Sequence, residues 1–283
     1  MSTIQIAVVT GANKGIGYGI VQALATQFKG IIYLTARNED IGKAAIIKLK
    51  SDNSAFVCKD IIFHQLDISD MDSIRRLQQH LRKTYGGIDI LINNAGIAFK
   101  VNDCTNFDIQ ARETIRVNYY GTLNMMLEML GLIRPNGRYI NVSSTVGSLS
   151  LIMNSEMHNY LINPQLTISD LNSVMEKFIT AAKENTIERD GIFSKSAYGM
   201  SKLGLTLLSF CIQREVDRER PDDKILVIPC CPGYVDTDMS SHQGHKTILE
   251  GADTPVFLAL IPSSKFDEFH YRFVSDRKPK EFQ

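Results

Sequence analysis

The sequence predicts a doubly wound α/β fold, in which helices cover both faces of a parallel sheet. Short apolar runs alternate with amphipathic stretches along nearly the whole chain. Most of these runs are apolar throughout, as expected for parallel strands that are buried on both faces. Successive strand–helix pairs then form βαβ units with right-handed crossovers. Because no repeat or low-complexity linker divides the sequence, we expect a single domain over residues 1–283.

The apolar runs and the helical patterns between them fix the expected elements. We expect strands at Ile4–Val9, Ile31–Thr35, Ile62–Leu66, Ile88–Ile92, Tyr139–Val142, Ile225–Pro229 and Tyr271–Val274. We expect helices at Ile16–Phe28, Ile41–Lys50, Met71–Tyr85, Ile109–Gly131, Ala197–Arg218 and Glu250–Leu260.

One segment, residues 149–193, interrupts the alternation of strands and helices. Its centre has apolar residues at helical spacing, including Leu171, Val174 and Phe178. Thr167 with Asp170 three residues later resembles a helix cap. We therefore expect a helical insertion in this region and no further strand.

Composition excludes several classes of partner. The 283 residues suffice for a sizeable core, and 31 basic residues balance 31 acidic ones. A chain without net charge is a poor generic ligand for nucleic acid or a membrane surface, and we expect neither as a partner. No apolar run approaches the length of a membrane span, and the N-terminus does not resemble a signal peptide. The five cysteines include no Cys-x-x-Cys pair, which favours reduced thiols in the cytoplasm, and we expect no metal site.

A glycine-rich turn separates the first strand from the first helix: Thr10-Gly11-Ala12-Asn13-Lys14-Gly15-Ile16-Gly17. Glycines keep such a turn tight and let the backbone approach a phosphate without an intervening Cβ. The N-terminus of the following helix offers unpaired N–H groups and a positive dipole end. The turn therefore predicts a dinucleotide site, although glycines at this spacing also fit an ordinary tight turn.

Further polar features follow the other predicted strands. They are Arg37, Asp67, Asn93-Asn94-Ala95-Gly96, Ser143-Ser144, Tyr198-x-x-x-Lys202 and Pro232-Gly233. Each of them lies at the carboxyl end of a strand or just beyond it. Open parallel sheets bind ligands along this edge, so the sequence places all of these features around one cleft.

In this combination the chain resembles the short-chain dehydrogenase/reductase superfamily, whose members have a Rossmann-type sheet. The segments Thr-Gly-Ala-Asn-Lys-Gly-Ile-Gly, Asn-Asn-Ala-Gly-Ile-Ala-Phe-Lys and Cys-Cys-Pro-Gly, and the insertion before Tyr198, resemble its monomeric carbonyl reductase branch. The resemblance spans nearly the whole chain. It implies an NADPH-dependent carbonyl reductase that transfers hydride to ketones, quinones and aldehydes.

Carbonyl reduction needs a hydride for carbon and a proton for oxygen, and the protein supplies the acid. Tyr198 and Lys202 are four residues apart on a predicted helix and so share one face. An ammonium about 5 Å from a phenol, at an effective dielectric constant of ~20, would lower the phenol pKa from ~10 towards ~8. The resemblance makes Tyr198 the general acid and Lys202 also a ligand of the nicotinamide ribose. It further makes Ser144, rather than Ser143, a hydrogen-bond donor to the substrate, and Asn118 a holder of water in a proton relay.

The second strand indicates which cofactor is used. A carboxylate about 20 residues after the glycine turn would bind the ribose hydroxyls of NAD. The strand ends instead in Arg37, whose guanidinium suits a 2′-phosphate, and Lys14 adds a second positive charge. We therefore expect NADPH, the alternative being that both are ordinary surface cations. We expect the cofactor to contact the turn residues Gly11, Asn13, Lys14, Gly15, Ile16 and Gly17. The resemblance adds further cofactor contacts: Asp67, Ile68, Asn94, Tyr198, Lys202, Pro232, Val235 and Thr237.

The expected substrate contacts are Ser144, Tyr198, Cys231, Tyr234 and Met239. The resembled branch often has tryptophan just after Pro-Gly, where this chain has Tyr234, so the shape of the pocket should differ. Cys231 could be a reactive thiol or a small buried apolar group.

The insertion enlarges the separation between Ser144 and Tyr198. The resemblance implies that it covers the helices through which other short-chain reductases associate, so we expect a monomer. Two alternative functions stay open: a sensor or scaffold that binds NADPH without turnover, and an alcohol or steroid dehydrogenase with one substrate. The joint presence of Asn118, Ser144, Tyr198 and Lys202 favours an enzyme, because a binding module does not need an acid.

Overall fold

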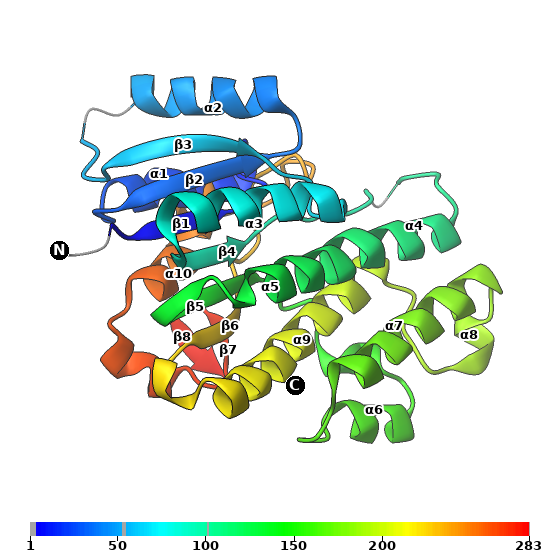
Figure 1. The fold of residues 1–283 in the computed structure, drawn as a ribbon. Helices are drawn as coiled ribbons and strands as arrows, with labels where there is room; N and C mark the ends of the chain where they lie inside the picture. Colours follow the sequence, from blue (N-terminus) through cyan, green and yellow to red (C-terminus); the bar gives the residue numbers. More distant parts are fainter. Residues whose placement is uncertain (1–3, 53–54, 101, 283) are drawn as a thin grey trace.

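A parallel sheet forms the centre of the molecule, with helices on both faces (Figure 1). The computed structural model describes residues 4–52, 55–100 and 102–282. Within these residues the strand order is β3-β2-β1-β4-β5-β6-β7-β8, and only the pairing of β7 with β8 is antiparallel. The strands are β1 (Ile6–Val9), β2 (Ile31–Ala36), β3 (Asp60–Gln65), β4 (Ile88–Asn93), β5 (Ile133–Val142), β6 (Leu226–Cys231), β7 (Phe273–Ser275) and β8 (Lys278–Lys280). The predicted doubly wound sheet is confirmed.

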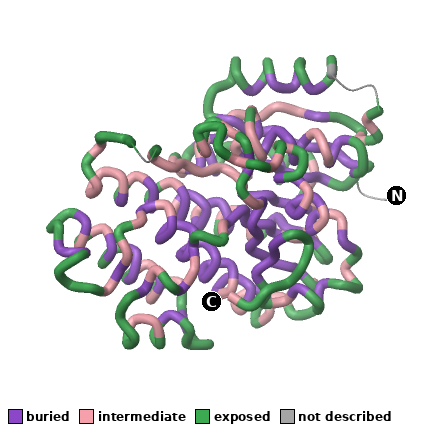
Figure 2. The backbone as a smooth tube through the Cα atoms, turned by 180° about the vertical axis from the view of Figure 1, so that it is seen from behind, coloured by how far each residue is buried: buried purple, intermediate pink, exposed green. Residues whose placement is uncertain are grey.

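Helices cover both faces of the sheet. They are α1 (Gly15–Ala25), α2 (Glu39–Asp52), α3 (Met71–Tyr85), α4 (Phe107–Thr114), α5 (Thr122–Leu130), α6 (Ser155–Leu161), α7 (Ile168–Lys183), α8 (Ile187–Asp190), α9 (Ala197–Glu219) and α10 (Ile248–Leu260). α7 packs outside the helices that cover the sheet, against α4 and α9. One apolar core joins the sheet to α1, α2 and α10, and a second core joins its other face to α3, α5 and α9. Figure 2 shows the buried backbone concentrated in the sheet and the inner helices. None of the described helices combines the length and the hydrophobicity that a membrane crossing requires.

The largest differences from the predicted strands are in β5 and β8. β5 begins at Ile133, well before the expected start at Tyr139. Ile133 pairs with Ile88 of β4, and the register of the pairing then shifts between Ile88 and Ile90. Pro135, Asn136 and Gly137 occupy this part of the strand, and such turn-forming residues hide it from an apolar pattern. β8 was not predicted, because its three residues are all exposed and none continues an apolar run.

The helix expected at Ile109–Gly131 is divided by a wider turn. Residues Ile115–Gly121 form a π-helical segment between α4 and α5. A π-helical turn inserts a residue into a helix and is frequent at functional sites. Asn118 lies in the middle of this segment and is buried.

The region between β5 and α9 is helical and packs against the rest of the chain. Thr167 caps the N-terminus of α7, and with Asp170 it forms the expected capping box. The buried side chains of α7, which include Val174 and Phe178, belong to the core that α4 and α9 share, and α7 contacts both of these helices. A bridge between Ile152 and Phe193 brings the two ends of the region together.

Candidate active site

The glycine turn and the loop after β4 are held together as one unit. The Thr10 hydroxyl accepts hydrogen bonds from the backbone N–H groups of Asn94 and Ala95, each at 3.0 Å. The Asn94 amide donates in return to the carbonyls of Thr10 and Gly11, also at 3.0 Å. Gly11 has φ +62°, and a Cβ there would lie 2.8 Å from the Ala95 Cα, so only glycine fits.

The start of α1 has the properties of a phosphate site. Lys14 precedes the helix in an extended conformation, no side chain caps the helix, and its first turn contains no acidic residue. Its first N–H groups and its dipole therefore face the glycine turn without a competing carboxylate. A Cβ on Gly15 would lie 3.5 Å from the Thr237 methyl group, so the loop after β6 passes over the same turn.

Tyr198 and Lys202 project from the first turns of α9. The Ser196 hydroxyl caps this helix by accepting from the Gly199 N–H at 3.1 Å. The Lys202 Nζ lies 5.6 Å from the centre of the Tyr198 ring and donates to the Val142 carbonyl at 2.7 Å. The end of β5 therefore holds a buried lysine beside the phenol.

The two serines after β5 have different surroundings. The Ser143 hydroxyl is buried, donates to the Lys202 carbonyl at 3.0 Å and lies 2.7 Å from the Thr206 hydroxyl, so it attaches the strand to α9. The Ser144 hydroxyl accepts from the Val146 N–H at 3.3 Å and lies close enough to the Tyr198 phenol to lower the phenol pKa. The structure thus brings Ser144, and not Ser143, to the phenol.

Asn118 connects the π-helical segment to the loop after β4 and to α9. Its side-chain oxygen accepts from the Ile97 N–H at 2.7 Å. Its amide group donates to the Ile97 carbonyl at 2.9 Å and to the Ser201 hydroxyl at 3.0 Å. A Cβ on Gly96 would lie 3.0 Å from the Asn118 oxygen and 3.9 Å from the Lys202 Nζ, so the glycine keeps the space between these two groups open.

Burial controls the protonation of the Tyr198–Lys202 pair. It raises the pKa of the Tyr198 phenol, with a smaller contribution from Cys231, while the Ser144 hydrogen bond lowers it. Burial also lowers the pKa of the Lys202 ammonium from 10.5 to about 8. The expected fall of the Tyr198 pKa towards ~8 is therefore wrong for the protein alone, since removal from water outweighs the attraction of a nearby ammonium. At neutral pH the phenol carries its proton.

The expected cofactor residues line the same edge of the sheet, with some differences in what they contact. Arg37 is exposed at the end of β2. Asp67 accepts from the Ser69 N–H and hydroxyl at 2.9 and 2.7 Å, and Ile68 packs against Gly121. Pro232 and Val235 are buried, and Val235 directs its side chain at Gly251 of α10.

The expected substrate residues Cys231, Tyr234 and Met239 lie at the end of β6 and on the loop that follows it. Cys231 is buried close to the phenol, and its sulfur accepts from the Gly233 N–H at 3.3 Å. Tyr234 and Met239 lie on the loop after β6 with 50% and 45% of their surface exposed. Their role at the substrate stays a prediction.

Three residues of the site were missed by the sequence prediction. Thr10 and Ser201 could have been found, because Thr10 directly precedes Gly11 and Ser201 is three residues from Tyr198 on one helix face. Asp238 pairs with Lys14 at 2.6 Å across a sequence separation of 224, and no local pattern indicates such a contact. Within the described residues no group of three or more candidate metal ligands is present.

Comparison with known proteins identifies the family. The family model described as short chain dehydrogenase matches residues 5–156. The protein belongs to this family. This short chain dehydrogenase is 44% identical to carbonyl reductase (NADPH) 3 of Rattus norvegicus over 277 residues, which cover 98% of each chain. It is 43% identical to carbonyl reductase (NADPH) 1 of Homo sapiens over 282 residues, which cover 99% of each chain.

Solved structures show the same fold for this short chain dehydrogenase. Salutaridine reductase from Papaver somniferum superposes with a TM-score of 0.83 and 30% identity, covering 96% of this chain and 99% of the other. An NADPH-bound carbonyl reductase from chicken fatty liver superposes with a TM-score of 0.67 over 99% and 100% of the two chains. At 21% identity, the second comparison concerns the fold alone.

The buried charge of Lys202 should make stability depend on pH. Because the folded-state pKa of about 8 lies below the ordinary value of 10.5, the unfolded chain binds more protons between these limits. Below pH 8 the buried charge of Lys202 therefore lowers the free energy of unfolding by its full amount. This loss of stability shrinks as the pH rises towards 10.5. We expect Lys202→Met to gain stability relative to the wild type, by more at pH 7 than at pH 10, in urea denaturation.

Lys177→Met is the matched control, because Lys177 is exposed on α7. Its stability relative to the wild type should not change with pH over this range. A difference between wild type and Lys202→Met that is the same at pH 7 and pH 10 would contradict a depressed lysine pKa.

Proposed function

We propose that this protein reduces carbonyl compounds with NADPH and that Tyr198 is its general acid. The observation that carries the proposal is the convergence of Ser144, Tyr198 and Lys202 at the carboxyl edge of the sheet, beside a glycine turn suited to a dinucleotide. The names of its curated relatives support the same reaction. We further propose ketones, quinones and aldehydes as the substrate class.

The residues around the glycine turn fit NADPH. The turn brings backbone close to a ligand, and the uncapped start of α1 provides N–H groups for a pyrophosphate. Arg37 offers an exposed cation for a 2′-phosphate, and no carboxylate occupies the end of β2. Lys14 is the second cation, and it would exchange its ion pair with Asp238 for the phosphate. When bound, NADPH supplies the hydride.

The protein supplies the proton and the positioning. The Ser144 hydroxyl donates a hydrogen bond to the carbonyl oxygen and holds it beside the Tyr198 phenol. The phenol, protonated at neutral pH, gives its proton to this oxygen as negative charge develops there. Lys202 stabilises the phenolate that remains, since its ammonium lies against the Tyr198 ring. Asn118 orders the loop around Ile97 and borders the space through which water returns a proton.

Replacing Tyr198 with Phe removes the acid and keeps the shape of the cleft. We expect turnover of menadione or isatin to fall by a factor of ~10² to 10⁴, the usual contribution of a general acid. NADPH binding, followed by the fluorescence of the reduced nicotinamide, should change little. Turnover is read from the loss of NADPH absorbance.

Tyr160→Phe is the control, because Tyr160 is a partly exposed tyrosine on α6. Undiminished activity of Tyr198→Phe would overturn the assignment of the acid. If the wild type consumed no NADPH across a broad carbonyl panel, a sensor without turnover would be favoured. Activity on a single member of the panel would indicate a narrow alcohol or steroid dehydrogenase.

Arg37 should determine the preference for NADPH over NADH. A hydrogen bond between charged groups contributes about 1.5–3 kcal/mol, so Arg37→Gln should weaken NADPH binding by roughly 10- to 100-fold. Binding of NADH, which lacks the 2′-phosphate, should stay within about twofold, because it loses no such bond. Titration of both cofactors by fluorescence measures the ratio. Arg189→Gln on α8 is the control, and an equal loss for both cofactors would refute the role of Arg37.

We also propose that the protein is a cytoplasmic monomer. α7 of the same chain covers the outer faces of α4 and α9. Less surface of these two helices is therefore available for contact with a second copy of the protein. All five cysteines are free thiols, as is usual in a reducing compartment. Sedimentation equilibrium should give the mass of one chain, 31.7 kDa. A mass two or four times larger would refute the monomer.

A further inference from the structure

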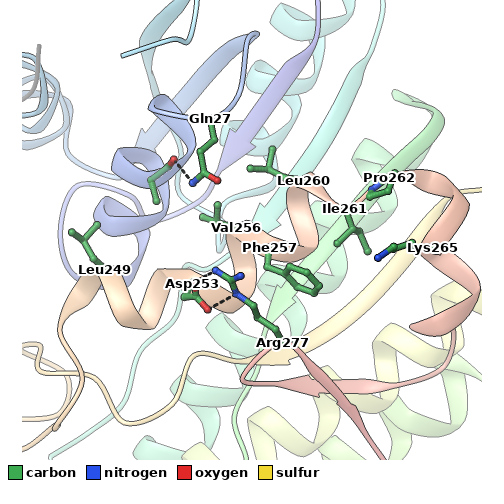
Figure 3. Close-up of a pocket in the computed structure, with 11 residues that line it drawn as sticks. Gln27, Leu249, Asp253, Val256, Phe257, Leu260, Ile261, Pro262, Lys265 and Arg277 are labelled. Atoms are coloured by element: carbon green, nitrogen blue, oxygen red, sulfur yellow. Dashed lines mark hydrogen bonds and ion pairs between the residues drawn. The ribbon is translucent and has the colours of Figure 1, made fainter. Parts of the chain in front are cut away.

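A second pocket lies far from Tyr198 in the fold. It has a volume of about 360 Å³ and is formed by α1, α10, the segment after α10 and the turn between β7 and β8 (Figure 3). α10 and α1 belong to the core on one face of the sheet, whereas α9 with Tyr198 and Lys202 covers the opposite face. The pocket is therefore separate from the candidate active site.

The walls of this pocket are mainly apolar. They include Val256, Phe257 and Leu260 of α10, together with Leu249, which has 49% of its surface exposed. Leu249 is exposed and Phe257 and Leu260 are partly exposed within a concave surface, and the buried Val256 forms its floor. Burying them against an apolar ligand is favourable, because it removes their surface from water.

The backbone conformation of the β7–β8 turn positions a cation at this pocket. Asp276 and Arg277 have φ +52° and +60°, the left-handed region that usually selects Asn or Gly in such turns. The Arg277 N–H donates to the Thr254 hydroxyl at 3.2 Å, and its guanidinium donates to the Asp253 carboxylate at 2.7 Å. The guanidinium carbon also lies 5.4 Å from the centre of the Phe257 ring. Arg277 is thus a preorganised cation at the apolar wall.

A second cation, Lys265, contributes to the same pocket. Lys265 is exposed on the 3₁₀ segment Ser263–Glu268, and no ion pair to it occurs among the described residues. Figure 3 shows Lys265 and Arg277 on either side of Phe257. Asp253 is the only carboxylate among the lining residues, so the lining has an excess of positive charge.

We propose that this pocket binds a small organic anion, consisting of one carboxylate on an aryl or alkyl body. The body packs against Val256, Phe257 and Leu260, and the carboxylate binds at Arg277 and Lys265. The Nε and Nη2 groups of Arg277 already pair with the two oxygens of Asp253, so the ligand carboxylate accepts from the remaining Nη1 group and from the Lys265 ammonium. The volume lies in the range of roughly 300–1,000 Å³ that is usual for small-molecule sites.

The test compares an acid with its uncharged analogue on the NADPH-loaded protein. Calorimetry should show saturable binding of 4-phenylbutyrate and at least about fivefold weaker binding of 4-phenylbutanamide, which has the same shape without the charge. Arg277→Gln should weaken binding of the acid about tenfold and Lys265→Gln about threefold, since Lys265 is more exposed. Lys177→Gln, on the surface of α7, should bind the acid as the wild type does.

Equal binding of acid and amide would overturn the proposal, as would full affinity in both Arg277→Gln and Lys265→Gln. Displacement of the acid by menadione would also overturn it, because it would place the acid in the catalytic cleft. Arg277 also holds the turn, so Arg277→Gln could impair folding. The Lys265 ammonium forms no ion pair among the described residues, so Lys265→Gln should fold normally. If Arg277→Gln does not fold, Lys265→Gln alone tests the proposal.

Discussion

The hydrogen bond from the Lys202 ammonium to the Val142 carbonyl fixes the geometry of the candidate active site. A buried lysine loses most of its hydration, and this one is compensated by a backbone oxygen at the end of β5. The neighbouring backbone is arranged around it: Ser143 donates to the Lys202 carbonyl, and a Cβ on Gly147 would come within 2.6 Å of the Lys202 Cβ. The strand and the helix therefore cannot shift relative to each other without displacing the charge beside Tyr198.

The π-helical segment Ile115–Gly121 fixes the position of a second site residue, Asn118. It directs Asn118 at the backbone of Ile97 and at Ser201, so three elements meet at one amide side chain. Ser201 in turn donates to the Tyr198 carbonyl at 2.8 Å, which connects this arrangement to the first turn of α9. Lys202 and Asn118 are consequently held independently, one from β5 and one from the π segment, with Gly96 between them.

Much of this arrangement follows from local sequence. Buried parallel strands are apolar throughout, so β1, β2, β4 and β6 could be located, and polar residues at their ends mark the cleft. Properties that depend on tertiary contacts could not be predicted. No local residue pattern distinguishes the π segment from an α-helix, and the Lys14–Asp238 pair joins distant loops. The pKa of Tyr198 depends on burial that only the folded chain provides. Tyr234 and Met239 lie on the exposed loop after β6, and their assignment to the substrate stays a prediction.

The short last strand, β8, has a consequence for behaviour in concentrated solution. It forms one border of the sheet, and its residues Lys278, Pro279 and Lys280 are all exposed. Unpaired backbone groups at a sheet border can recruit strands from other molecules, and lysine and proline are the residues that most effectively prevent this. Pro279 has no N–H to offer, and two ammonium groups repel an identical border. The Lys-Pro-Lys strand therefore protects the folded enzyme from edge-to-edge aggregation.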